Sequence, residues 1–293
     1  MMKNVFSPEF LAEYERHQTA PVDATPTGLP TLDRICRDAG GGKGIGRSWF
    51  VTVAGNPGFG KSALALNFAS AALNHGESIG LISLEMSAQQ VSTRLYALHT
   101  GTHLKTLEHG GFNAQSWLET KQKLSGSPPL YVPDTVLGDW KAVVEYTEQC
   151  YEAGCRYIIL DYLQLCNTGD EDTIYKATQR VVSELRAFGV RKGCTILCLS
   201  QFNRTTSANY DSPPRSQGLF GGQIVEASSD LVLLLDHSRF KREGNHTGLG
   251  FLLTGKNRHG PTITSGIPIT FDYRTLKIEE ANEQEFSEDR WPT

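Results

Sequence analysis

The sequence predicts an α/β fold in which a mainly parallel, twisted sheet is covered by helices on both faces. Apolar runs of strand length alternate along the chain with longer segments of helical pattern, as in strand–helix–strand units. Glycine or polar residues follow four of these apolar runs, at Gly55, Glu85, Asp161 and Gln201. Because the carboxyl ends of parallel strands meet at one edge of such a sheet, we expect these residues to converge on a ligand site.

The composition is that of a globular chain of 293 residues, enough for one large α/β domain with extensions or for two small domains. Its net charge of −4 excludes a global basic field, so any contact with DNA or RNA must come from local loops. There is no apolar run of membrane-span length and no signal-peptide core, so we expect a cytoplasmic protein without membrane contact. Six cysteines without a C-x-x-C pair fit a reduced interior better than disulfides or zinc.

The expected strands are short apolar runs, several of them ending in a polar residue. They are 49–54, 79–84, 130–132, 156–162, 195–201, 231–235, 250–254 and 267–273. The expected helices are marked by helix-forming composition and by end signals, such as the capping-box spacing of Ser87 and Gln90 and the terminal glycine at Gly193. They are 63–73, 87–98, 113–124, 139–153 and 173–191.

The segment between the first strand and its helix reads G-x-x-x-x-G-K-S, which in this context predicts a phosphate-binding loop. Its glycines permit backbone angles that turn N–H groups inward, and the helix N-terminus adds partial positive charge. Lys61 would reach the β- and γ-phosphates of ATP, and Ser62 would bind Mg²⁺. The expected nucleotide-binding residues are Gly55, Asn56, Pro57, Gly58, Phe59, Gly60, Lys61, Ser62 and Ala63.

Three polar residues at other strand ends fit the remaining needs of phosphoryl transfer to water. Asp161 follows four apolar residues and suits the acid that holds Mg²⁺ directly or through water. Glu85 could orient or deprotonate the attacking water, or it could be a surface residue. Gln201 could sense the γ-phosphate, or it could end its strand by hydrogen bonding. The residues alone leave both alternatives open.

A basic turn at 256–262 separates two of the later strands. Most such turns are solvated hairpin tips. The alternative is a cationic finger, in which Lys256 and Arg258 would stabilise transition-state charge on the nucleotide of a neighbouring subunit.

The chain divides into an N-terminal arm and linker at 1–26, a nucleotide-binding globular domain at 27–278 and an acidic tail at 279–293, which we expect to be disordered. In the arm, Ser7 and Pro8 predict the start of a short helix that runs to about Arg16. An isolated helix of this length is marginal in water, so it would dock on its own domain or on another subunit.

Six stretches together resemble the ATPase domain of DnaB-type replicative hexameric helicases, within the RecA-like P-loop NTPases that also include RadA and KaiC. They occur in the family's order at 27–33, 55–62, 83–87, 159–165, 199–201 with Arg204, and 256–262. The resemblance implies that Glu85 is the catalytic base, Asp161 the magnesium-binding acid and Gln201 the γ-phosphate sensor. It also implies that the two cations Lys256 and Arg258 act on the adjacent subunit's ATP.

The resemblance further implies a homo-oligomer, usually a ring of six subunits, that moves on single-stranded DNA during replication and docks its N-terminal helix on a neighbour. Two departures bear on this. Only some 27 residues precede the match, where the family has a primase-binding domain. The channel loop, 217–226, carries Phe220 near the family's arginine, although the N–H groups of Gly221 and Gly222 could hold a phosphate. Arg204 and Arg215 could add charge there, and Phe220 could stack on a base.

Two functions from different classes therefore compete. The first is an ATP-driven helicase or translocase on single-stranded DNA. The second is an ATP switch that assembles on DNA or partner proteins without separating strands, as in defence, transposition or recombination. A monomeric small-molecule kinase is disfavoured, because the two cations of the basic turn would lack a role.

Overall fold

The computed structural model describes residues 23–36, 43–111, 113–134, 137, 139–165, 173–202, 218–236, 247–263 and 265–281. Within these ranges, no helix is long and apolar enough to span a membrane. The expected helix near Ser7, the two arginines Arg204 and Arg215, and the tail from residue 282 onward lie outside the described residues.

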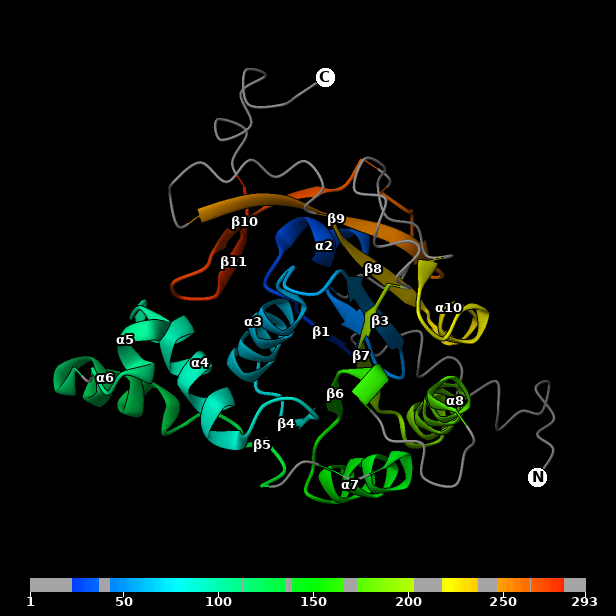
Figure 1. Cartoon of the computed structure of the whole chain (residues 1–293), viewed down its shortest axis with the longest axis horizontal. Coiled ribbons are helices and arrows are strands. Elements are labelled where there is room, and N and C mark those ends of the chain that lie inside the picture. The colour runs from blue at the N-terminus through cyan, green and yellow to red at the C-terminus, as the bar shows by residue number, and fades with distance from the viewer. Residues whose placement is uncertain are drawn as a thin grey trace, which may run out of the picture.

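Nine described strands form one sheet in the order β11-β10-β9-β8-β3-β7-β6-β4-β5 (Figure 1). Its strands are β3 (Phe50–Gly55), β4 (Ile79–Ser83), β5 (Leu130–Tyr131), β6 (Tyr157–Asp161), β7 (Thr195–Gln201), β8 (Leu231–Asp236), β9 (Thr247–Asn257), β10 (Ile267–Asp272) and β11 (Lys277–Glu280). The pairings from β8 through β5 are parallel, and those from β8 to β11 are antiparallel. The prediction of a mainly parallel sheet is confirmed.

Helices cover both faces of this sheet, as predicted (Figure 1). Their bounds are α2 (Pro30–Ile35), α3 (Lys61–Asn74), α4 (Ala88–Thr100), α5 (Leu104–Glu108), α6 (Ala114–Leu124), α7 (Trp140–Glu152), the 3₁₀ turn η1 (Leu163–Leu165), α8 (Ile174–Lys192) and α10 (Gln223–Ser228). Side chains of α3 and α4 belong to one buried cluster, and side chains of α7, α8 and α10 belong to a second. The sheet separates the two.

The central strand β3 shows how the sequence builds these two layers. All six of its residues are buried. Val51 and Val53 belong to the cluster on the α3 side, whereas Phe50 and Ala54 belong to the other. Successive side chains of a strand point to opposite faces, so a continuous apolar run is what a strand covered on both sides requires.

The predicted helix ends agree with the structure in two clear cases. The side chain of Ser87 accepts a hydrogen bond from the N–H of Gln90, whose side chain in turn accepts one from Ser87, which is the expected capping box. Gly193 ends α8 with a φ of 67°, a left-handed conformation that favours glycine. These local signals depend on nearby residues alone, which is why the sequence reveals them.

Both expected boundaries of the ATPase domain need correction. The sequence places Glu279 and Glu280 in a disordered tail, but in the structure they belong to β11 and pair with Thr270 and Ile269 of β10. Likewise β1 (Ala24–Thr25), inside the expected linker, pairs with β2 (Ile45–Gly46). In both places a polar, charged or proline-rich sequence is held by backbone hydrogen bonds to another strand, and composition does not report such pairing.

Candidate functional site

The phosphate loop lies between β3 and α3, as predicted. Gly58 and Gly60 have φ values of 78° and 86°, a backbone conformation that residues other than glycine rarely adopt. Gly55 does not have a positive φ, but a side chain there would be crowded, since a Cβ would lie 3.2 Å from the Cβ of Leu235. The glycines therefore serve two purposes, turning the backbone and allowing neighbouring strands to approach.

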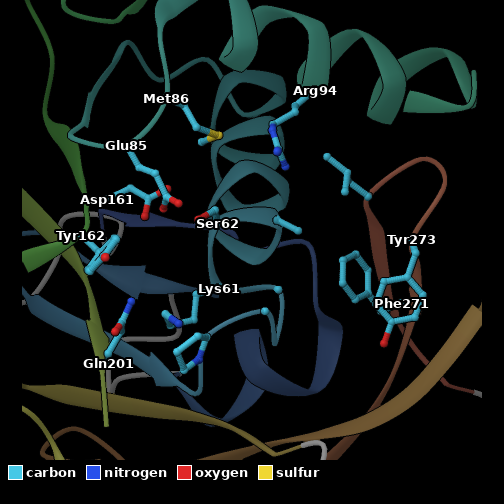
Figure 2. A pocket seen from close by; sticks show the side chains of 15 residues that line it. Lys61, Ser62, Glu85, Met86, Arg94, Asp161, Tyr162, Gln201, Phe271 and Tyr273 are labelled. Carbon is cyan, nitrogen blue, oxygen red and sulfur yellow. The ribbon is translucent and has the colours of Figure 1, made fainter. Parts of the chain in front are cut away.

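Around this loop is a cavity of about 320 Å³ at the carboxyl edge of the parallel strands. Lys61, Ser62, Glu85, Asp161 and Gln201, which come from four separate segments of the chain, all line it. Figure 2 shows Glu85 and Asp161 on one side of Ser62, with Phe271 and Tyr273 facing them across the cavity. The structure thus brings together the five side chains expected to bind or react with the phosphates.

Lys61 is the buried cation of the cavity, with 7% of the residue exposed. Its Nζ donates hydrogen bonds to the carbonyl oxygens of Gly55 and Asn56, each at 3.0 Å. Burial lowers the pKa of Lys61 to about 8, against the opposing effect of the nearby carboxylates Asp161 and Glu85. A phosphate group entering the cavity would meet a fixed ammonium group that has lost most of its water.

Asp161 is the buried anion, with 2% of the residue exposed at the end of β6. It forms a hydrogen bond with Ser62, yet its Oδ1 has no partner among the described residues. Burial raises the pKa of its carboxyl group to about 6. A buried carboxylate oxygen without a partner, beside a serine hydroxyl, is a donor set that suits Mg²⁺, so the residues fit the expected ion.

Glu85 and Gln201 complete the polar side of the cavity. The N–H of Leu84 donates to the carbonyl oxygen of Asp161 at 2.7 Å, which fixes the exposed Glu85 beside that acid. Gln201 ends β7 directly opposite Gly55, and its side chain forms a hydrogen bond with Tyr162. Both side chains therefore line the same cavity as Lys61 and Asp161.

The expected channel loop begins at this same point. The N–H of Phe220 donates to the carbonyl oxygen of Gln201 at 3.0 Å, and Phe202 pairs with Leu219 in an isolated bridge. Gly221 and Gly222 follow with φ values of 88° and 59° and lead into α10. Of the expected DNA-binding residues, the structure describes these two glycines and Phe220.

Sequence reasoning missed several residues that line the cavity: Met86, Arg94, Tyr162, Phe271, Tyr273 and Leu276. Phe271 and Tyr273 have ring centroids 4.5 Å apart at an interplanar angle of 51°. A Cβ on Gly60 would lie 2.8 Å from the Phe271 ring, so this aromatic pair packs against the phosphate loop. The pair was visible at the end of an expected strand, but only the antiparallel fold of β10 brings it to the cavity.

Lys256 and Arg258 do not line the cavity. Arg258 follows β9, and its backbone N–H donates to the carbonyl oxygen of Asp230 at the start of β8. Asp230 in turn is bonded to Phe50, the first residue of β3. The phosphate loop begins at the other end of β3, five residues on and roughly 16 Å away at the usual rise of a strand. The two cations are therefore at the opposite edge of the sheet from their own chain's cavity.

The fold and the phosphate loop define a RecA-like nucleotide-binding domain. Residues 24–280 match the family model for the DnaB-like helicase C-terminal domain, and the chain belongs to that family. A probable plasmid replicative DNA helicase of Chlamydia psittaci is 27% identical over 256 residues, which make up 85% of this chain and 54% of that protein. The replicative DNA helicase DnaB of Leifsonia xyli is 28% identical over 265 residues, covering 86% and 55%. The chain spans about half the length of these curated relatives.

Solved structures agree on the fold. The ATPase domain of G40P superposes with a TM-score of 0.78 at 20% identity, covering 96% of this chain and 100% of that one. A DnaB-like replicative helicase, studied for its interactions with primase, gives a TM-score of 0.76 at 20% identity over 96% of this chain and 68% of that one. A KaiC-like protein of Pyrococcus horikoshii gives 0.58 at 17% identity, over 89% and 100%.

Proposed function

We propose that this chain is the motor of a DnaB-type helicase or translocase, which moves on single-stranded DNA by hydrolysing ATP between the subunits of a ring. The observation that carries the proposal is the division of the expected catalytic groups between two edges of one sheet. Five groups surround the cavity, and the two remaining cations lie at the far edge. Membership of a family whose relatives are named replicative helicases supports DNA as the substrate and replication in the cytoplasm as the setting.

In this proposal the cavity performs phosphoryl transfer to water by positioning and charge neutralisation. Lys61 and the N–H groups of the loop bind the phosphates, and Glu85 holds the attacking water and accepts its proton. Gln201 contacts the terminal phosphate and reports its loss to Phe220 through the hydrogen bond between their backbones. Ser62 and Asp161 would hold a magnesium ion, whose chemistry when bound is to neutralise charge on the β- and γ-phosphates.

The aromatic side of the cavity gives the nucleotide's base a place to bind. Tyr273 is 36% exposed and lies against Phe271, so one ring is supported while the other offers a face. Stacking on such a platform is favourable for any purine. Arg94, which reaches into the cavity from α4 in Figure 2, adds a second cation on the phosphate side.

The position of the two cations supports an assembly in which each subunit acts on the ATP of its neighbour. Arg258 cannot reach Lys61 of its own chain across the length of β3, but it can reach the cavity of a neighbour stacked edge to edge. Each site would then be completed by two subunits, and hydrolysis would depend on assembly.

The proposal is tested by measuring ATP turnover with and without single-stranded DNA, together with oligomer mass and unwinding of a forked duplex. We expect a ring whose turnover rises on DNA and whose DNA binding weakens as salt increases. Normal basal turnover without any response to DNA would contradict the translocase.

The alternative is a non-unwinding switch, and one observation favours it. Phe220 stands near the position at which the family pattern has an arginine, so the channel loop of this chain lacks that phosphate-binding cation. A switch would assemble with ATP without separating strands. The variant Phe220→Arg sharpens the choice: in a translocase it should tighten DNA binding and steepen its salt dependence by about one charge, whereas a protein-binding loop would lose its partner and gain little affinity for DNA.

A further inference from the structure

Asp230 is a buried carboxylate that the reaction described above does not use. Its side chain is 5% exposed and sits between β3, α8 and the end of β9. Oδ2 accepts hydrogen bonds from the N–H of Phe50, at 2.9 Å, and from Nη1 of Arg186. Oδ1 accepts from Nη2 of Arg186, at 3.1 Å, and from Nη1 of Arg258, at 3.2 Å. Strand β3 and helix α8 therefore fix the carboxylate, and Arg258 binds to it.

Arg258 is held at two points and remains accessible. Besides its bond to Asp230, its Nη2 donates to the carbonyl oxygen of Ala227, at 2.6 Å, near the end of α10. Its side chain is nevertheless 43% exposed. A guanidinium group has five N–H donors, so two fixed contacts leave others for an anion on the exposed side. The side chain of Arg258 is therefore oriented, and some of its N–H donors remain available for a ligand.

The charges around this carboxylate explain why the contact does not cancel the cation. Arg186 forms a two-pronged pair with Asp230 and balances its charge. Arg258 therefore keeps its own positive charge for an outside ligand. Nearby, Nζ of Lys256 donates to the carbonyl oxygen of Glu226 at 2.5 Å, adding a second cation on the same surface. The local balance is positive and suits a phosphate.

Fixing an arginine before it binds the triphosphate can raise the rate of hydrolysis. A free arginine side chain loses conformational freedom when a ligand fixes it, which costs free energy. A transition-state contact that is misplaced by about 1 Å costs on the order of a hundredfold in rate. A buried anchor lowers both costs.

We infer that Asp230 is a positioning residue that holds Arg258 in the pose in which it meets the triphosphate of the adjacent subunit. This inference rests on the proposed function, because it needs Arg258 to act across a subunit interface. It adds to that function a residue that never touches ATP yet sets the rate of hydrolysis.

The variant Asp230→Asn tests this, because it keeps an oxygen for the N–H of Phe50 and removes the charge that holds Arg258. We expect kcat for ATP to fall by about ten- to a hundredfold, with KM for ATP and ring mass little changed. The double variant Asp230→Asn, Arg258→Ala should be no slower than Arg258→Ala alone. Asp33→Asn is the matched control, since Asp33 also accepts a backbone N–H bond, from Thr27 at 2.7 Å, but its side chain bonds to Thr27 and not to either cation. It should leave kcat unchanged.

A second readout separates positioning from a general loss of structure. Subunits with Asp230→Asn have an intact cavity, and subunits with Lys61→Ala have an intact Arg258, so mixed rings should turn over ATP faster than the average of the two pure samples. If Asp230→Asn melts at the assay temperature, the same mixing is carried out below its melting temperature, and the same gain is expected.

Three results would overturn the inference. They are an unchanged kcat in Asp230→Asn, a raised kcat, which would make Asp230 a latch that restrains Arg258, and a loss that mixing fails to restore. Failure of the proposed function itself looks different: Arg258→Ala would then turn over ATP normally, whatever Asp230 does.

Discussion

At the carboxyl edge of the parallel strands Lys61 and Asp161 are buried, whereas at the opposite edge Arg258 is nearly half exposed and bonded to a carboxylate and a carbonyl oxygen of its own chain. Burial moves the pKa of Lys61 down and that of Asp161 up, because the charges nearby only partly offset the loss of water around each group. At the opposite edge Asp230 is paired with Arg186, so it orients Arg258 while that arginine keeps its positive charge. The first edge is built to receive a ligand, and the second to present a cation.

Under the proposed function, this difference means that one subunit carries the two halves of a shared site at places that cannot meet within that subunit. Oδ1 of Asp161 is buried in the cavity and has no hydrogen-bond partner in the part of the chain that the structure describes, whereas Arg258 is held by Asp230 and Ala227. A ring of head-to-tail subunits requires a cation at one edge of each sheet and a cavity for the nucleotide at the opposite edge, so that the arginine of one subunit meets the cavity of the next. The following variants test each half, beginning with the largest expected effect.

Lys61→Ala should abolish hydrolysis, with a loss of about ten-thousandfold or more, because it removes the only buried cation that the described cavity offers the phosphates. Nucleotide binding should weaken as well. Phosphate release and fluorescent-nucleotide binding measure the two effects. Turnover near the wild-type rate would show that the cavity is not the site of chemistry.

Arg258→Ala should lower kcat by about a thousandfold while each subunit still binds ATP. The two edges are independent in this respect, so the variant separates binding from catalysis where Lys61→Ala cannot. Binding and turnover assays on the same preparation provide the comparison. Lys277→Ala is a suitable control, as Lys277 lies in β11 and pairs with Glu279 at the surface. Equal behaviour of the two variants would remove Arg258 from the mechanism.

Asp161→Asn should raise the magnesium concentration needed for half-maximal activity by about ten- to a hundredfold. The same variant should stabilise the protein free of nucleotide and magnesium. Burial raises the folded-state pKa from 3.8 to about 6, so wild-type stability is lost as pH rises through this range, by up to about 3 kcal/mol.

Urea unfolding should therefore favour the asparagine variant at pH 8, with a difference that shrinks at pH 5 and vanishes below the unfolded pKa of 3.8. A variant that is less stable than wild type at pH 8 would mean that the charged carboxylate is well compensated without a metal.

Tyr273→Leu gives the smallest effect. Loss of a stacking face should raise KM for ATP by about three- to tenfold and leave kcat nearly unchanged, because the base takes no part in the reaction. Steady-state kinetics with ATP, and then with inorganic tripolyphosphate as a ligand without a base, distinguish the two contributions. Competition by tripolyphosphate should be the same in variant and wild type.

The sequence predicted what depends on neighbouring residues. The phosphate loop, the capping box of Ser87 and the polar ends of β6 and β7 are local patterns, and parallel pairing then brings Asp161 and Gln201 to Gly55. What it missed depends on distant pairing. Phe271 and Tyr273 reach the cavity through the antiparallel strands β9 and β10, and Asp230 meets Arg258 through the register of β8 with β9. No spacing of residues along the sequence predicts these contacts.

The central claim is that one ATP is shared between Glu85 of one subunit and Arg258 of the next. Mixing is its most direct measurement: Glu85→Ala subunits and Arg258→Ala subunits are each assayed for ATP turnover alone and then after reassembly together. The account predicts that the mixture is clearly more active than either pure sample, since some interfaces then pair an intact Glu85 with an intact Arg258. Turnover of the mixture no higher than the average of the two pure samples would contradict it.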